Sequence, residues 1–250
     1  MHPLLFSLGP IKIYSWGFMV AVAFVVGVLV AVMRAKKEGI SEETTLDICV
    51  YVMISSIIGA RLFYVIGFFD QFRSNIWSVF AFWEGGMVFY GGLIFAAGAL
   101  FLAAKKNKLS PLKCLDIACL SAAIGYSIGR IGCFLRGCCY GLECSPPWGM
   151  HFSGVEGTVI PTQLYSAIAG IIIFTVLAHI YDRKKYDGQV FYWGLIVYSV
   201  YRFLIEFFRA YPSHYLGLTA SQWISIAVFA AAIIAARMMR SSAAFSKSIK

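Results

Sequence analysis

The stretch IYSWGFMVAVAFVVGVLVAVM at residues 13–33 decides the fold class. It contains no charged side chain, and a helix of about 20 apolar residues is long enough to cross the hydrocarbon core of a bilayer. The basic run Arg34-Ala35-Lys36-Lys37 follows at once. An apolar stretch of this length that ends in basic residues is typical of a membrane span. No positively charged run precedes it, so we expect a retained helix and not a signal peptide.

Six further stretches are long and apolar enough to span, at residues 46–69, 87–104, 115–135, 162–181, 190–208 and 221–239. Of the 250 residues, 60% are hydrophobic and 13% are charged, and the mean hydropathy is +0.77. This composition excludes an ordinary soluble domain. We therefore predict an all-α integral membrane protein with seven transmembrane helices, as a single polytopic membrane domain over residues 1–250. A shorter apolar stretch at 76–83 is expected to be interfacial or re-entrant.

Basic side chains gather at alternate ends of the predicted helices. These residues are Arg34, Lys36, Lys37, Lys105, Lys106, Lys108, Lys113, Arg183, Lys184, Lys185, Arg237, Arg240, Lys247 and Lys250. The positive-inside rule then places the N-terminus outside and the C-terminus in the cytoplasm. The net charge of +9 follows mostly from this topology, and it requires no nucleic-acid partner.

Four arginines lie inside or at the edge of the predicted spans: Arg61, Arg130, Arg202 and Arg209. A charge at membrane depth persists where it lines a wet cavity, meets a partner or holds an anion. The planar guanidinium suits phosphate, because it forms paired hydrogen bonds and stays charged. All four fall in the outer halves of their helices, beside the longer connections at 70–86, 136–161 and 209–220. The sequence therefore predicts a site for an anionic lipid headgroup near the outer leaflet.

Arg202, Glu206 and Arg209 are spaced i, i+4 and i+7, which places them on one face of a continuous helix. An internal ion-pair ladder would explain this spacing through packing alone. One carboxylate against two guanidinium groups leaves positive charge, however, and a lipid phosphate would balance it. Tyr198 shares the face and would offer a hydroxyl to the same ligand.

Glycines accompany the other two arginines. Gly129 and Gly132 flank Arg130, and glycine permits close approach of a helix or of a ligand. The alternative is a small-residue helix contact whose arginine extends outward to water. Arg61, in Gly59-Ala60-Arg61, is open to the same two interpretations.

Four motifs occur in order along the chain: WEGGMVFYGGL at 83–93, GRIGCFLRGCCYG at 129–141, PTQLY at 161–165 and RFLIEFFR at 202–209. With these motifs the chain resembles the prolipoprotein diacylglyceryl transferase family from end to end. The resemblance implies transfer of the diacylglyceryl group of phosphatidylglycerol to the lipobox cysteine thiol of a prolipoprotein, with release of glycerol phosphate. It also implies an enzyme of the bacterial cytoplasmic membrane whose active site faces the outer leaflet and needs no cofactor.

The resemblance suggests roles for individual residues. Arg130 and Arg202 match the arginines to which the family assigns the phosphate, and Tyr90 stands at the position of a catalytic side chain. The candidate substrate-binding residues are Arg61, Glu206, Arg209, Tyr198, Gln163, Gly91 and Gly92.

The chain also departs from the family pattern. Tyr90 replaces the usual histidine, Cys133 the usual asparagine and Cys138 the usual glutamate, while Ile160 and Ser166 stand where histidine and glutamate are common. A phenol is mostly protonated at neutral pH, so phosphate binding is better supported than proton transfer. Two rivals therefore stay open: a divergent paralogue with another acceptor or cysteine chemistry at Cys133 and Cys138, and a non-catalytic lipid-binding membrane protein.

Cys133, Cys138, Cys139 and Cys144 lie within twelve residues on the predicted outer side. A disulfide is the preferred interpretation, because thiols outside the cytoplasm tend to oxidise. A reactive thiolate comes second, since a cation such as Arg130 lowers a thiol pKa. Zinc comes third, because the spacing C-x4-CC-x4-C differs from the usual C-x2-C pairs, and we assign no metal ligand.

Overall fold

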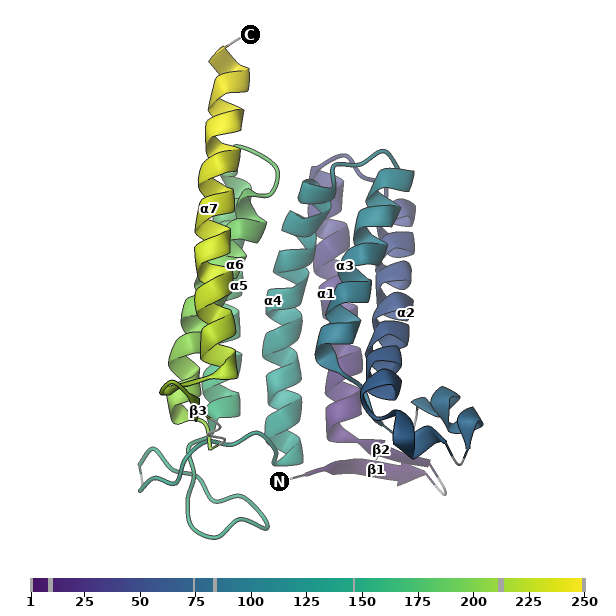
Figure 1. Cartoon of the computed structure of the whole chain (residues 1–250), viewed down its shortest axis with the longest axis vertical. Helices are drawn as coiled ribbons and strands as arrows, with labels where there is room; N and C mark the ends of the chain where they lie inside the picture. Colours follow the sequence, from purple (N-terminus) through teal and green to yellow (C-terminus); the bar gives the residue numbers. More distant parts are fainter. Residues whose placement is uncertain are drawn as a thin grey trace. The chain divides into compact units, whose positions relative to one another are not determined.

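The computed structural model describes residues 2–8, 11–73, 75–82, 85–145, 147–210 and 214–248. Within these residues seven helices are long and apolar enough to cross a membrane, which confirms the predicted number (Figure 1). They are α1 (Ser15–Lys37), α2 (Glu42–Gly67), α3 (Phe89–Lys106), α4 (Pro111–Arg136), α5 (Thr162–Asp182), α6 (Gln189–Ile205) and α7 (Ala220–Ser248).

Short elements that the apolar pattern did not predict precede the first helix or connect later ones. Two antiparallel hairpins pair β1 (Leu4–Leu8) with β2 (Ile11–Tyr14), and β3 (His214–Tyr215) with β4 (Leu218–Thr219). The 3-10 turns are η1 (Phe69–Phe72), η2 (Ile76–Phe80) and η4 (Glu206–Phe208). The stretch expected at the interface holds η2, where Trp77 is 76% exposed, whereas residue 83 lies outside the described residues.

The chain divides into two compact units, Ala31–Leu115 and the combination of Met1–Val30 with Asp116–Lys250. In the Ala31–Leu115 unit, α2 and α3 pack side by side. Glycine makes their closest approach possible: a Cβ on Gly59 would lie 2.6 Å from the Gly91 carbonyl oxygen, and one on Gly91 would lie 2.4 Å from the Gly59 carbonyl oxygen. A Cβ on Gly92 would lie 3.1 Å from the Ser56 carbonyl oxygen. These glycines therefore serve helix packing.

In the other unit, α6 packs against both α5 and α7. A buried carboxylate fixes the start of α6, because Asp116 of α4 accepts hydrogen bonds from the backbone N–H groups of Gly188 and Phe191, each at 2.9 Å. Lys184 pairs with the same carboxylate at 3.4 Å. An acidic side chain at a helix N-terminus satisfies otherwise unpaired N–H groups and the helix dipole.

The outward faces of the helices are apolar. On α5, Ile168 and Ile172 are 57% and 58% exposed and lie one turn apart on the same face. A face of this kind is unfavourable in water but meets lipid tails without cost in a bilayer. Together with the seven apolar helices, this makes the chain an integral membrane protein.

Candidate active site

The end of α4 turns the chain back onto its own last turn. Gly137 adopts a left-handed φ of 76°, and its N–H donates to the Phe134 carbonyl oxygen at 3.0 Å. The Cys138 N–H donates to the Cys133 carbonyl oxygen at 3.1 Å. These two bonds form the glycine-terminated cap known as a Schellman motif, which satisfies the final carbonyl groups of the helix. The cap brings Cys138 next to Cys133.

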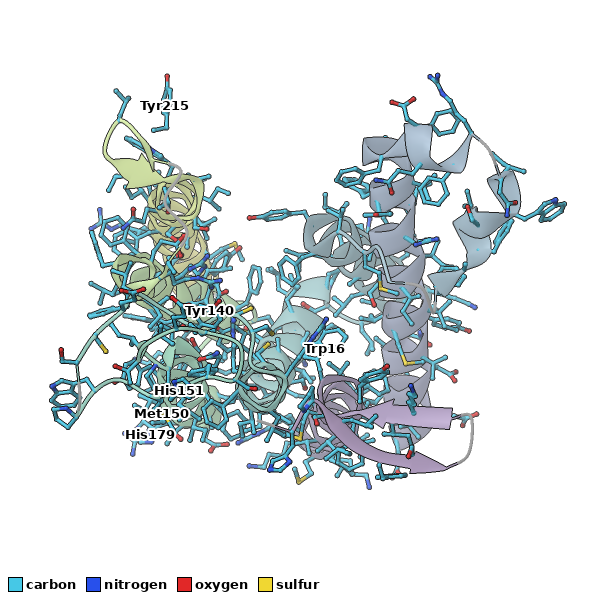
Figure 2. All side chains as sticks on the ribbon, turned by 90° about the horizontal axis from the view of Figure 1, so that it is seen from below. Trp16, Tyr140, Met150, His151, His179 and Tyr215 are labelled. Atoms are coloured by element: carbon cyan, nitrogen blue, oxygen red, sulfur yellow. The ribbon has the colours of Figure 1, made fainter. Side chains whose placement is uncertain are left out.

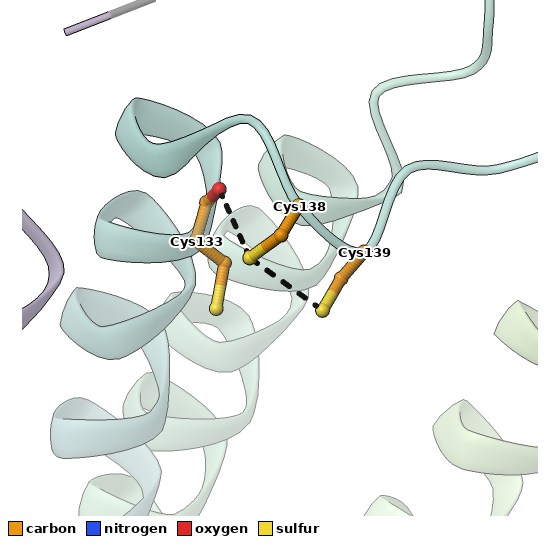
Figure 3. Close-up of side chains that lie close together, drawn as sticks. All are labelled: Cys133, Cys138 and Cys139. Atoms are coloured by element: carbon orange, nitrogen blue, oxygen red, sulfur yellow. Dashed lines mark hydrogen bonds between the residues drawn. The ribbon is translucent and has the colours of Figure 1, made fainter. Parts of the chain in front are cut away.

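Cys139 joins the same group through an unusual backbone conformation. Its φ of 65° lies in the left-handed region, which is rare for a residue with a Cβ. The thiol groups of Cys133, Cys138 and Cys139 all lie within 4.8 Å of one another, and Figure 3 shows them converging from the helix and the following loop. The sulfur atoms of Cys138 and Cys139 are 3.8 Å apart.

Two side chains at the start of α5 hold this loop. Thr162 Oγ1 donates to the Cys139 carbonyl oxygen at 2.8 Å, and Gln163 Nε2 donates to the Cys138 carbonyl oxygen at 2.7 Å. Gln163 is fully buried, and its Oε1 has no hydrogen-bond partner among the described residues. The sequence singled out Gln163 as a contact for substrate, whereas in the structure its amide group positions the cysteine loop.

All seven cysteines are free thiols, so the disulfide preferred from the sequence is not present. Cys144 does not belong to the three-thiol group. Hydrogen bonding to the Cys133 thiol lowers the pKa of Cys139 to about 5, and the positive charges of Arg130 and Arg209 act in the same direction. Burial raises the pKa of Cys138. Cys139, which the sequence named only as a member of the cysteine cluster, is therefore a more acidic thiol than Cys138.

Arg130 lies on α4, three residues before Cys133 and thus on the same helix face. Its guanidinium carbon is 4.8 Å from the centre of the Tyr126 ring, and the Tyr126 hydroxyl is 2.8 Å from the Tyr201 hydroxyl. None of the ion pairs among the described residues includes Arg130. Tyr126 was missed from the sequence, although its position one turn before Arg130 was a usable signal.

Arg202 and Arg209 both approach Glu206. Arg202 donates to the carboxylate and, at 2.7 Å, to Ser221 Oγ, whereas Arg209 Nε lies 3.9 Å from Glu206 Oε2. Thr219 Oγ1 donates to the remaining carboxylate oxygen at 3.1 Å. The predicted cluster of one acid and two arginines therefore forms within this unit.

One part of that prediction was wrong. Arg209 is not on the same helix as Arg202, because α6 ends at Ile205 and Glu206–Phe208 form η4. Arg209 itself is extended, with φ −93° and ψ 144°, and it forms a β-bridge with Gly141. A Cβ on Gly141 would lie 2.2 Å from the Phe208 carbonyl oxygen, so glycine is needed for this contact. The loop after α4 thus pulls Arg209 out of helical geometry.

Further contacts hold the loop that follows α4. Met150 and His151 are labelled in Figure 2. Met150 forms an isolated β-bridge with Val159, and His151 Nδ1 lies 2.9 Å from the Gly157 carbonyl oxygen. Before the loop, the Arg136 guanidinium stands 6.0 Å from the centre of the Trp16 ring. Backbone pairing and cation–π contact therefore order the segment that carries Cys138 and Cys139.

Tyr198 and an apolar groove lie along α6. Tyr198 is 39% exposed, and its ring meets the Tyr126 ring edge-on with centroids 5.8 Å apart. The groove has a volume of about 560 Å³. Its lining residues come from α5, α6 and η4: Tyr165, Ala169, Ile172, Ile173, Ile196, Val197, Val200, Tyr201, Leu204, Ile205 and Phe208. Tyr201 therefore belongs both to the groove and to the tyrosine pair beside Arg130.

Arg61, Tyr90, Gly91 and Gly92 belong to the Ala31–Leu115 unit. Arg61 is only 5% exposed, and its donors go to the carbonyl oxygens of Val79 at 2.9 Å, Ser78 at 2.5 Å, Gly85 at 2.6 Å and Gly86 at 3.2 Å.

These contacts change the interpretation of three candidates. Arg61 holds a loop, and Gly91 and Gly92 pack helices, so the predicted contact of these residues with substrate gains no support from the geometry. Tyr90 lies at the start of α3 and is 53% exposed. Its side chain is therefore open to solvent, lipid or ligand.

Nearly the whole chain matches the model of a known protein family. The model of the prolipoprotein diacylglyceryl transferase family matches residues 3–238. Among similar proteins, the phosphatidylglycerol–prolipoprotein diacylglyceryl transferase of Finegoldia magna is 37% identical over 94% of both chains. The enzyme of the same name from Clostridioides difficile is 35% identical over 94% of both chains. That of Clostridium tetani is 32% identical over 90% of this chain and 93% of its own. The chain therefore belongs to the prolipoprotein diacylglyceryl transferase family.

Proposed function

We propose that this chain transfers the diacylglyceryl group of phosphatidylglycerol to the thiol of a prolipoprotein lipobox cysteine. The new bond joins the acceptor sulfur to the glyceryl carbon, and the carbon–oxygen bond to the phosphate breaks. Glycerol phosphate leaves with the electron pair, and the product is a thioether. The family match over residues 3–238 and the names of the relatives support this transferase over the paralogue and binding-protein alternatives.

The observation that carries the proposal is the state of Arg130. A guanidinium in a membrane-spanning helix, stacked on Tyr126 and outside every described ion pair, retains its charge for an anionic ligand. Phosphate is the natural ligand, because the guanidinium fork forms paired hydrogen bonds with it. Negative charge grows on the leaving phosphate as the carbon–oxygen bond breaks, and a fixed cation stabilises that charge without reorganising.

Arg202 and Arg209 supply a second positive group. Glu206 neutralises one charge of the two, and the remainder favours an anion. Arg202 is already bound to Glu206 and Ser221, so we assign it a fixed orientation toward the phosphate. Its side chain is 19% exposed, which leaves part of the guanidinium accessible.

The apolar groove between α5 and α6 suits an acyl chain of the lipid donor. Its volume of about 560 Å³ is lined by aliphatic and aromatic side chains, and one of them, Tyr201, belongs to the tyrosine pair beside Arg130. A lipid with its tail in this groove and its phosphate at Arg130 would enter laterally from the bilayer. Tyr198, at the exposed edge of the tyrosine cluster, is positioned to contact the headgroup.

We place these groups at the outer leaflet of the bacterial cytoplasmic membrane, with the N-terminus outside and the C-terminus in the cytoplasm. The basic clusters at the ends of α1 and α3 support this orientation. Arg130 and Arg202 are near the C-terminal ends of α4 and α6, which this orientation turns outward. For Tyr90 we propose that its hydroxyl contacts the substrate.

Turnover by the purified full-length protein tests the proposal. The protein is incubated in detergent micelles with phosphatidylglycerol and a lipobox peptide, and the peptide mass and the release of glycerol phosphate are followed. We expect a diacylglyceryl adduct on the cysteine, with equal amounts of adduct and glycerol phosphate.

Two controls define the reaction. A peptide with serine in place of the lipobox cysteine should give no adduct, and phosphatidylethanolamine should not replace the lipid donor. Lipid binding without any adduct, under conditions in which a relative such as the Finegoldia magna enzyme turns over, would contradict the proposal and favour a binding protein.

A further inference from the structure

The three-thiol group at the end of α4 has the geometry of a metal site. We propose that Cys133, Cys138 and Cys139 bind one thiophilic divalent cation of the zinc class and leave its fourth position open. Zinc–sulfur bonds are about 2.3 Å long, so two sulfurs on one tetrahedral ion lie about 3.8 Å apart. Cys138 and Cys139 have their sulfur atoms at 3.8 Å, and all three sulfurs lie within 4.8 Å (Figure 3). Only a small inward movement of the thiols is needed.

Hydrogen bonds to the backbone hold the three thiols close together before any metal binds. The α4 cap fixes Cys138 against Cys133, and Thr162 and Gln163 hold the next two carbonyl groups of the loop. Cys139 keeps a left-handed φ of 65°. A strained residue held in place by its surroundings is typical of functional sites. Supporting hydrogen bonds of this kind are also what orients metal ligands.

The number of thiols argues against a simple disulfide. Cys138 and Cys139 are adjacent, with Cα atoms about 3.8 Å apart, which is below the usual range for a disulfide. A bond from Cys133 to either one would leave the third thiol without a function. A thiophilic cation uses all three, and soft thiolate sulfur is the ligand that such cations prefer.

The charges around the group suit a metal bound by thiolates. Three thiolates and one divalent cation carry a single net negative charge. Arg130 lies one turn before Cys133 on α4, Arg136 ends the same helix, and Arg209 is held beside the following loop by its β-bridge with Gly141. Cations near a thiol favour its thiolate form, which is the form that binds metal. The arginines therefore balance the complete site.

The open position has a consequence that rests on the proposed transferase function. Cys133, Cys138 and Cys139 would hold the cation, and a lipobox thiol bound at the open position would lose its proton to water and become a thiolate. Its sulfur would then attack the glyceryl carbon while Arg130 held the departing phosphate. No general base is required in this step, which accounts for a chain that carries Tyr90, Cys133 and Cys138 in place of histidine, asparagine and glutamate.

Cadmium binding tests the site directly. Cd²⁺ is titrated into the reduced, metal-free full-length protein in micelles, and thiolate-to-metal charge-transfer absorption is followed. We expect saturation at one equivalent and displacement by Zn²⁺. Cys133→Ser, Cys138→Ser and Cys139→Ser should each weaken binding at least about 100-fold, because each removes a ligand. Cys144→Ser, in the same loop but outside the group, is the matched control and should bind like the wild type.

Circular dichroism checks that each variant is folded. The stoichiometry of Cd²⁺ binding to the wild type tests the site independently of the variants. No absorption in the wild type, or equal binding by all three folded variants, would overturn the site.

A turnover assay separates the site from its proposed role. Metal removal should lower adduct formation at least about tenfold, and Zn²⁺ should restore it. Turnover unchanged by metal removal would overturn the role of the open position and leave the transferase standing. Normal Cd²⁺ binding by a protein that never forms an adduct would overturn the transferase and support the site alone.

Discussion

Arg61 and Arg130 look alike in the sequence but differ in the structure. Both follow glycines inside apolar helices, and both were candidates for the lipid phosphate. Arg61 is 5% exposed and donates to four backbone carbonyl groups of one loop. Arg130 stacks on Tyr126 and takes part in none of the ion pairs of the described chain. The hydrogen-bond donors of Arg61 are therefore used within the protein, whereas Arg130 is available to bind an anion.

This difference shows how to distinguish a structural charge from a functional one. Both charges are expensive at membrane depth, so both require compensation. Four backbone carbonyl groups compensate Arg61, and its loss would remove these four hydrogen bonds. For Arg130, the Tyr126 ring and the Cys133 thiol give weaker compensation, which a phosphate would complete.

The largest effect is expected for Arg130→Ala. Turnover should fall about 1,000-fold, because the cation that stabilises the leaving phosphate is lost. Thermal stability should change little, since no described ion pair is broken. The measurement is adduct formation together with the melting temperature in micelles. Arg73→Ala, which removes an exposed ion pair with Asp70, is the control and should leave both unchanged. Full turnover in Arg130→Ala would remove the difference between the two arginines.

Arg61→Ala should mainly lower the stability of the protein. Four carbonyl oxygens each lose a hydrogen bond from the guanidinium, and we expect the free energy of unfolding to fall by about 3 kcal/mol. Arg61→Lys should recover part of this loss, because an ammonium group cannot reach all four oxygens with the geometry of a guanidinium. Chemical denaturation in micelles measures both variants. If Arg61→Ala is as stable as the wild type but inactive, Arg61 is a ligand-binding residue after all.

The apolar runs predicted the fold well because a bilayer imposes one requirement on every span. Each predicted helix agrees with an observed one to within a few residues, apart from α7, which continues to Ser248. The ends were less predictable. Hydropathy does not distinguish a helix from the 3-10 turn η4, and the departure of Arg209 depends on a bridge to Gly141, far away in the sequence. The N-terminal hairpin depends on local pairing and not on hydropathy.

Residue types predicted the site only in part. The pairing of Arg202 with Glu206 followed from helical spacing, because it lies within one turn. The convergence of Cys139 with Cys133 depends on a glycine cap and a left-handed backbone, which spacing rules do not contain. The tyrosine pair beside Arg130 joins residues 126 and 201 and needed the packing of two helices. Contacts made within one turn were therefore visible, and those made by tertiary packing were not.

Gly91→Ala extends the comparison from Arg61 to the glycines around it. A Cβ there would lie 2.4 Å from a backbone oxygen of α2, so the helices must separate, at a cost of about 2 kcal/mol. Gly98→Ala on the same helix meets no atom within 4 Å and should be neutral or slightly stabilising. Thermal melting of the two variants gives the difference. If Gly91→Ala and Gly98→Ala are equally stable and only Gly91→Ala has a raised KM, Gly91 contacts the substrate.

Tyr90→Phe has the smallest expected effect, and it tests directly whether a side chain of the Ala31–Leu115 unit contacts the substrate. The ring is 53% exposed, so loss of the hydroxyl should leave stability unchanged. We expect turnover to fall about tenfold, the loss of one hydrogen bond to substrate worth about 1.4 kcal/mol. A fall as large as that of Arg130→Ala would mean that this tyrosine performs the proton transfer, and a metal-bound acceptor thiol would then be unnecessary. Tyr14→Phe, at a tyrosine 58% exposed outside every candidate site, is the matched control and should retain full turnover.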